Sequence, residues 1–400
     1  MGAAPFREVV PGNCMTIYLV VAMAVLSQIG FGGSRVVMSL YALELGANQA
    51  TVGIIIALYS VCPLFFSIAL GRLSDRIAPR KPMIIGSLML AAALLLPALW
   101  PSIPMLFVAA FCLGLGHMVF DIPLEAAVGG IGGPQHRGRN YALITMGWSL
   151  ANFIGPLVTG FSIDGFAHRA TYCVLAAFVL LPILMFWRWP RMLPHTARVS
   201  AEEKHGGVME LLRIRELRAT YIAGGIIGSA QNLFQFYMPV YGHSLGLSAS
   251  AIGTVLGMVA LSAFFIRAAM PLLLRRFPEM TILKAAIFVA AFAYALFPFF
   301  SSALALAAIS FLLGLGMGCA QPMVMSLFYV LAPSGRIAEV TGIYKTLRGV
   351  THIVVPVLFG GLGTAFGFIT VFLANSAMLG TAGYLQRNAS AAARAKKHGT

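Results

Sequence analysis

Long apolar runs separated by short polar or Gly/Pro-rich segments follow one another along nearly the whole chain. The twelve runs cover residues 14–42, 50–70, 83–100, 104–128, 141–163, 170–189, 219–243, 250–272, 282–301, 303–330, 340–364 and 366–386. A helix that crosses a bilayer needs about 20 mainly apolar residues, and lipid forces a spanning segment to pair its own backbone polar groups. The pattern predicts an all-α integral membrane protein with twelve transmembrane helices.

The composition excludes other classes. The chain is 59% hydrophobic and only 10% charged, whereas soluble domains are about 45–50% apolar and about 25% charged. Disorder requires low hydrophobicity and high charge. The net charge of +15 does not indicate nucleic acid, because the basic residues separate apolar runs instead of forming one face. The bilayer is the partner that the sequence predicts.

The basic residues also predict an orientation. Of the 27 Lys and Arg residues, all but Arg35 and Arg169 fall on one side when the runs are threaded back and forth through a bilayer. Lys and Arg are enriched in cytoplasmic segments. The expectation is a plasma-membrane protein, in a bacterium the inner membrane, with both termini in the cytoplasm.

Motifs for a cofactor or an enzyme are not found. The five cysteines lie in or beside apolar runs without a CxxC pair, which favours a packing role over a metal site. The chain has neither an HExxH motif nor a P-loop. We therefore expect a protein that is not an enzyme, with no metal and no cofactor, whose energy comes from an ion or solute gradient.

An internal repeat relates the two halves of the chain at an offset of 200 residues. Matched positions include Gly, Pro and Tyr, which are hard to explain by apolar composition: Tyr41 and Tyr241, Gly46 and Gly246, Gly53 and Gly253, Gly114 and Gly314, Gly116 and Gly316, Pro156 and Pro356, and Gly160 and Gly360. Residues 190–218 form the longest hydrophilic segment between them. We expect a six-helix bundle over 1–189, a cytoplasmic linker over 190–218, and a second six-helix bundle with a short cytoplasmic tail over 219–400. Two such repeats are one plan of secondary transporters, which rock around a site near the midplane.

Two motifs resemble a known family. Residues 71–81 read GRLSDRIAPRK, which resembles the signature loop of the major facilitator superfamily. Gly155-Pro156 in the fifth run is similar to the Gly-Pro motif of that superfamily's proton-coupled antiporters. The resemblance implies the major facilitator fold, with the first, fourth, seventh and tenth spans around a central cavity. It also implies that Gly71, Asp75 and Arg76 belong to a latch between the halves on the cytoplasmic side.

Polar residues inside the runs are candidates for substrate binding. Arg35 lies deep in the first run, and its repeat mate is Gln235 in the seventh. A buried cation is costly and usually faces a cavity or a partner, so we expect Arg35 to bind an anionic or strongly polar group; a purely structural pairing is the alternative. The expected substrate-binding set is completed by Gln231, Asn232, Gln321, Asn152 and His352.

Three titratable residues recur every four residues in the fourth run, namely His117, Asp121 and Glu125. This spacing places them on one helical face. Burial favours the neutral form of a carboxyl group, so a carboxyl beside an imidazole has the chemistry of a proton relay. We expect these residues to carry the coupling proton. For Glu125 the alternative is that it is merely solvated at the membrane surface.

The gating residues are expected in the fifth and eleventh runs. Proline bends a helix and glycine permits close helix approach, so Gly155, Pro156 and Pro356 are expected to shape a gate, with simple packing as the alternative. Lys345 and Arg348 share a face near one end of the eleventh run. They could snorkel to the surface, attract an anionic substrate, or pair with the acids of the fourth run.

The favoured function is secondary active transport of a small organic solute by alternating access. We expect this transport to be coupled to protons and to export the solute, and we expect the protein to be a monomer. Uptake or exchange of an organic anion is the alternative, suggested by Arg35 and the basic face at Lys345. A transporter-like membrane sensor is the alternative from a different class.

Overall fold

The computed structural model describes residues 13–74, 78–131, 136–189, 208–333 and 336–398. Over these residues the chain folds into helices joined by short turns, with no strand. The helices are α1 (Asn13–Glu44), α2 (Gln49–Ser74), α3 (Arg80–Leu99), α4 (Ile103–Gly130), α5 (Arg137–Arg188), α6 (Val208–Arg213), α7 (Arg215–Ser244), α8 (Ala249–Arg276), α9 (Glu279–Leu296), the 3-10 helix Phe297–Phe299, α10 (Ala303–Leu331) and α11 (Ile337–His398).

The helices are long enough to cross a bilayer. Within the described part of the chain, nine are both long and apolar enough to do so. Two of the nine cover two expected spans each, because α5 contains a non-helical residue at Ala167 and α11 contains one at Gly367. Helix α7 is not among the nine, but it coincides with the seventh apolar run. With α5 and α11 each counted twice and α7 added, the helices correspond to the twelve expected spans.

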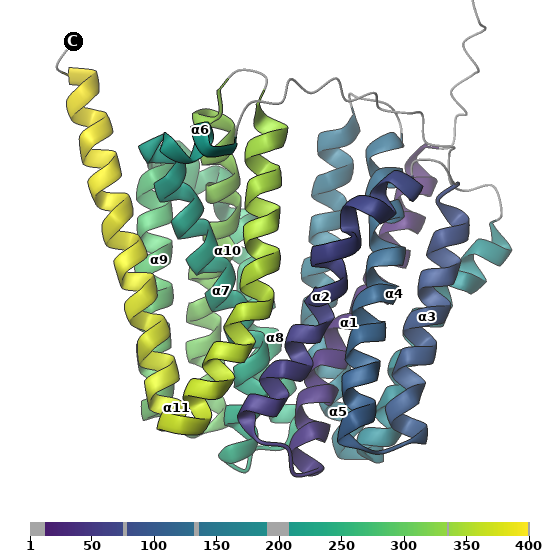
Figure 1. Cartoon of the computed structure of the whole chain (residues 1–400). Coiled ribbons are helices and arrows are strands. Elements are labelled where there is room, and N and C mark those ends of the chain that lie inside the picture. The colour runs from purple at the N-terminus through teal and green to yellow at the C-terminus, as the bar shows by residue number, and fades with distance from the viewer. Residues whose placement is uncertain (1–12, 75–77, 132–135, 190–207, 334–335, 399–400) are drawn as a thin grey trace, which may run out of the picture.

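Two bundles lie side by side (Figure 1), one built from α1–α5 and the other from α7–α11. We call the end that contains the turns at 45–48, 100–102 and 245–248 the turn side, and the opposite end, where the segment after α5 leaves the first bundle, the linker side. The breaks at Ala167 and Gly367 also lie on the turn side. Figure 1 shows the turn side at the bottom and the linker side at the top.

The repeat is visible in the backbone. The turn after α1 and the turn after α7 both place a glycine in the left-handed region, with φ of +85° at Gly46 and +73° at Gly246. The breaks are also 200 residues apart and share one conformation, with φ and ψ of 65° and 169° at Ala167 and of 78° and 179° at Gly367. The two bundles therefore turn the chain in the same way at equivalent positions.

Two backbone crossings join the bundles. A Cβ atom at Gly53 on α2 would clash with the carbonyl oxygen of Pro356 on α11, and a Cβ atom at Gly253 on α8 would clash with the carbonyl oxygen of Pro156 on α5. Small residues let helix backbones approach closely within a membrane. The repeat thus supplies a reciprocal pair of contacts, of the kind that a two-fold axis generates in a symmetric dimer. We call the α2/α11 and α5/α8 contacts the two seams.

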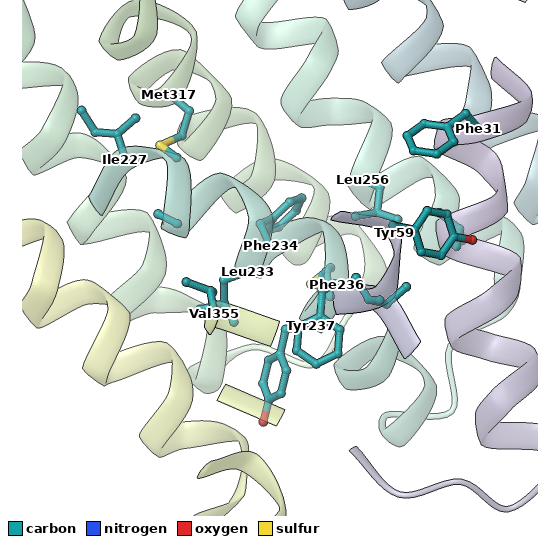
Figure 2. Close-up of a cluster of buried hydrophobic side chains, with 14 of the residues drawn as sticks. Phe31, Tyr59, Ile227, Leu233, Phe234, Phe236, Tyr237, Leu256, Met317 and Val355 are labelled. Carbon is teal, nitrogen blue, oxygen red and sulfur yellow. The ribbon is translucent and has the colours of Figure 1, made fainter. Parts of the chain in front are cut away.

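Apolar packing continues from one bundle to the other. Figure 2 shows Phe31 and Tyr59 of the first bundle at one side of a buried cluster, which extends to Phe236 and Tyr237 of the second. Tyr59, Phe236 and Tyr237 are at most 1% exposed. In lipid such packing comes mainly from van der Waals contact, so it fixes how the helices fit together at the junction.

The described part of the segment between the bundles is largely helical. Residues 190–207 lie outside the described part of the chain. Helix α6 and the first turn of α7, which begins at Arg215, occupy the rest of the segment assigned to the linker. Helix α7 extends beyond its apolar run because Glu216 in its first turn favours a helix N-terminus. At the other end, α11 continues to His398, past the last apolar run.

We predict that Gly253→Ala opens the α5/α8 seam, because the added Cβ would meet a backbone oxygen that cannot rotate away. Overpacking costs about 1–3 kcal/mol, which corresponds to about 5- to 150-fold in the ratio of open to closed seams. The measurement is the maleimide-labelling rate of a single cysteine placed at the half-buried Ser250 in the same seam, and this rate should rise.

The matched control is Gly361→Ala on α11, where an added Cβ would meet nothing within 4 Å. This variant should label at the parent rate. Equal rates in all three proteins would show that the crossing does not hold the seam.

Candidate functional site

Arg35 lies where the two bundles meet. On α1, its guanidinium Nη1 donates a hydrogen bond to Gln235 Oε1 of α7, 3.3 Å away. These two residues are repeat mates, so the structure brings together the pair that the sequence placed in equivalent spans. The contact crosses the junction nine residues before the C-terminal end of each helix, nearer to the turn side.

The surroundings of Arg35 are aromatic and uncharged. Its guanidinium carbon lies 5.3 Å from the ring centroid of Phe31 and 5.5 Å from that of Tyr59, which are cation–π distances. Its Nε is buried and has no hydrogen-bond partner. No ion pair joins Arg35 to a carboxylate within the described residues. The guanidinium therefore keeps donor capacity that a bound solute could use.

A histidine from α4 lines the same place. The ring of His117 stacks on Phe31, with centroids 3.7 Å apart and planes 10° apart. Its Nδ1 is buried without a partner. The charge of Arg35 acts on both His117 and His352 of α11. An arginine and an imidazole, each with an unsatisfied nitrogen, thus lie in one polar region at the centre of the protein.

The other expected substrate residues lie around this region, though not all touch. Asn232 donates from Nδ2 to the backbone oxygen of His352 at 3.4 Å. Asn152 accepts at Oδ1 from Nε2 of Gln28 at 3.2 Å. Gln231 and Gln321 are half-buried on α7 and α10, but neither forms a hydrogen bond with Arg35. Gln28 was not expected here, although a polar residue two helical turns before Arg35 on the same run was a usable signal.

The acids of α4 lie toward the linker side. Asp121 is half-buried, and the charges of Glu125 and Lys345 both act on it. Lys345 Nζ on α11 lies 4.0 Å from Glu125 Oε2, so one basic residue of the eleventh run does face the acids of the fourth. This ion pair is largely exposed, and such pairs are worth about 0–1 kcal/mol. It therefore adds little to stability, but it places a charge of the second bundle near Asp121.

Arg267 is a further cation at the junction. On α8, its Nη1 donates to Ser149 Oγ of α5 at 2.7 Å across the seam, and its Nε donates to the backbone oxygen of Gly318 at 3.3 Å. From the sequence, Arg267 was expected only as one of the basic residues of the cytoplasmic side. Its position inside an apolar run was the signal that could have marked it.

The expected gating residues have different outcomes. Asp75 and Arg76 lie outside the described residues, and Gly71 is described only as part of the backbone of α2. Pro156 and Pro356 supply the carbonyl oxygens of the two crossings, while the non-helical residues of α5 and α11 come later, at Ala167 and Gly367.

Gly155 and Arg348 each contact a helix of their own bundle. A Cβ atom at Gly155 would lie 3.2 Å from the backbone oxygen of Ile29, so this glycine lets α5 pack tightly on α1. Arg348 lies on α11 near Gly228 of α7, with its Cγ 3.7 Å from where a Cβ of that glycine would be. Neither contact crosses between the bundles.

A protein of many membrane-crossing helices, in which two related halves meet around polar residues, has the architecture of a secondary transporter. The comparison with protein families agrees: residues 20–356 match the model of the Major Facilitator Superfamily. The chain belongs to this superfamily, has its fold, and is a multi-pass membrane transporter and not an enzyme.

Similarity to curated proteins covers part of the chain. It is 30% identical over 179 residues to "Multidrug resistance protein MdtH" of Yersinia pestis (strain Pestoides F), a match that covers 45% of this chain and 44% of the relative. The same values hold for MdtH of Yersinia pseudotuberculosis serotype O:1b (strain IP 31758). The match thus spans less than half the length of these relatives.

Similarity to solved structures covers nearly the whole chain. A bacterial homolog of the human lysosomal transporter Spinster, inward-facing and unoccupied, has a TM-score of 0.76 at 14% identity and covers 96% of this chain and 98% of its own. The nucleoside transporter NupG has a TM-score of 0.73 at 14% identity, with 94% and 98% covered. A POT family transporter in complex with 5-aminolevulinic acid has a TM-score of 0.78 at 13% identity, with 95% and 96% covered. At these identities the similarity shows the fold alone.

We predict that Arg35→Gln stabilises the solute-free protein. Arg35 is half-buried and has no carboxylate partner among the described residues, so its replacement removes the desolvation cost of a cation, and Gln at this position would match its repeat mate. Single stabilising substitutions commonly raise the free energy of unfolding by about 0.5–2 kcal/mol. The measurement is the midpoint of thermal unfolding of the purified protein, which should rise.

Arg169→Gln is the matched control. Arg169 is exposed on the turn side and donates from Nε to the backbone oxygen of Ala98 at 2.8 Å, so its replacement should leave the midpoint unchanged or lower it. A lower midpoint for Arg35→Gln would assign Arg35 a structural role.

Proposed function

We propose that this protein exports a small organic solute in exchange for protons, by alternating access of one central site to the two sides of the membrane. The observation that carries this proposal is the polar centre at the junction, where Arg35 Nε and His117 Nδ1 are buried without partners. Buried polar groups are ordinarily hydrogen-bonded, and two such groups from different helices of one region fit a site that a ligand completes.

Proton coupling is proposed for Asp121. This carboxyl group is half-buried within a span, next to Glu125 and Lys345. A like charge and burial both favour the neutral form of an acid, while a cation favours the ionised form. Movement of Lys345 with the second bundle would therefore change the proton affinity of Asp121 as the halves rock, which is what coupling requires.

Export from a bacterial cytoplasm is the direction and place that the relatives favour. The MdtH proteins are named as multidrug resistance proteins, and the distribution of Lys and Arg favours a cytoplasmic linker side. Both backbone crossings lie toward the turn side, so the structure has the arrangement expected of an inward-facing state. The similarity to a transporter solved as inward-facing supports this interpretation.

A second candidate is uptake or exchange of an organic anion. Its specific support is Arg35, a guanidinium without a carboxylate partner among the described residues. An anionic group could satisfy the guanidinium with charge-assisted hydrogen bonds, which are the strong ones. The same central site would serve, and only the substrate class and direction would differ.

The test is transport by the purified protein in liposomes with an imposed pH gradient, screened against pooled cationic drugs and pooled organic anions. We expect Asp121→Asn to abolish gradient-driven transport but to leave solute counterflow measurable, because exchange of solute for solute needs no net proton movement. The two assays on one preparation separate coupling from binding.

Glu125→Gln is the matched control, because it neutralises a neighbouring acid on the same helical face. It should keep gradient-driven transport but change its pH dependence, because the charge of Glu125 acts on Asp121 without carrying the coupling proton. If Asp121→Asn still accumulates solute against the gradient, the coupling proton is carried elsewhere. Transport of anions alone would favour the second candidate.

A further inference from the structure

One carboxylate of the first bundle binds the start of a helix in the second. Asp164 lies on α5, three residues before the break at Ala167. Its Oδ1 accepts a hydrogen bond from the backbone N–H of Ala249 at 3.0 Å, and its Oδ2 accepts one from the backbone N–H of Ser250 at 2.9 Å. Both amides belong to the first turn of α8. The contact therefore crosses the α5/α8 seam on the turn side.

This carboxylate completes the capping of α8. The first amides of a helix have no partner within the helix. In α8, the third amide, that of Ala251, donates to Ser248 Oγ at 3.2 Å, and the fourth, that of Ile252, donates to the Ser248 backbone oxygen at 3.1 Å. Among the described residues, Asp164 alone accepts hydrogen bonds from the first two. A negative charge at a helix N-terminus is also favoured by the helix dipole.

The equivalent position in the other seam is built differently. There the repeat mate of Asp164 is Thr364, whose Oγ1 accepts one hydrogen bond from the backbone N–H of Ala50 at 3.1 Å. The start of α2 is otherwise capped from within its own bundle, because Asn48 Oδ1 accepts from the backbone N–H of Thr51 at 2.8 Å. The α2/α11 seam thus has one hydrogen bond to a neutral hydroxyl where the α5/α8 seam has a bidentate contact with a carboxylate.

We propose that Asp164 is a gating residue for transport, a latch that holds the turn side closed by capping α8 from the opposite bundle. Opening the turn side separates α5 from α8, so it breaks two charge-assisted hydrogen bonds and leaves two amides of α8 without a protein partner. The proposal rests on alternating access, but it depends on neither the solute nor the coupling ion.

The test measures the distance between the bundles on the turn side. Spin labels are placed on cysteines at Leu99 and Phe299, repeat-related positions that are 60% and 72% exposed, in protein whose native cysteines are replaced. Pulsed electron–electron resonance in liposomes without solute or pH gradient then gives the populations of short and long distances. The measurement needs neither solute nor a pH gradient, so its result does not depend on whether the proposed export and proton coupling are correct.

In Asp164→Asn we expect the ratio of long to short distances to rise about 10-fold, the lower end for a hydrogen bond to a charged group, because Asp164 is exposed and solvent screens it. Asparagine keeps one oxygen that can accept a hydrogen bond from one of the two α8 amides, but its NH₂ group is a donor and cannot accept one from the other amide. Asp164→Glu restores the carboxylate and should recover most of the closed population. Thr364→Val, the repeat-matched control, should shift the ratio less.

Two results would overturn the proposal: an Asp164→Asn distribution equal to that of the parent, or a larger shift in Thr364→Val than in Asp164→Asn. A salt titration of the parent protein, in which Asp164 is present, gives a second measurement of the distance populations that does not depend on how the variants fold. Because exposed charges are screened by salt, raising the ionic strength should increase the long-distance population of the parent and leave that of Asp164→Asn unchanged.

Discussion

The two close backbone crossings determine the rest of this structure. At each, a helix passes so near to the carbonyl oxygen of a proline that only a glycine fits opposite it. Because the repeat supplies Gly53 with Pro356 and Gly253 with Pro156, the bundles meet along two equivalent seams and not at one. The seams fix how the two bundles face each other, and the hydrogen bond between Arg35 and Gln235 crosses the same junction.

The centre that results has charged groups for which the described residues provide few opposite charges. Arg35 bonds to an amide, and Arg267 bonds to a hydroxyl and a backbone oxygen. A protein built only for stability would gain from replacing such groups with apolar residues of similar volume. Their presence at the junction agrees with the binding site that we propose there and with membership of a transporter superfamily.

Much of the fold could be predicted from the sequence, since run length and the offset of 200 residues need no tertiary information. The spans, the repeat and the meeting of Arg35 with Gln235 were accessible in this way. The stacking of His117 on Phe31 and the hydrogen bond from Gln28 to Asn152 were not, because they depend on how far neighbouring helices rotate and slide. Asp164 was missed because an acid at the end of a span is expected to be solvated, and nothing local reveals a helix start in another bundle.

On the central helices the repeat has also diverged in charge. Four titratable residues of α1 and α4 are Arg35, His117, Asp121 and Glu125, and their mates on α7 and α10 are Gln235, Met317, Gln321 and Met325. Since the halves of such transporters rock largely as rigid bodies, the four titratable groups keep their mutual distances while their uncharged mates move past them. Charge from the second half reaches the junction instead through Arg267 of α8 and Lys345 of α11, so rocking changes the distances between charges of different halves and not those within the first.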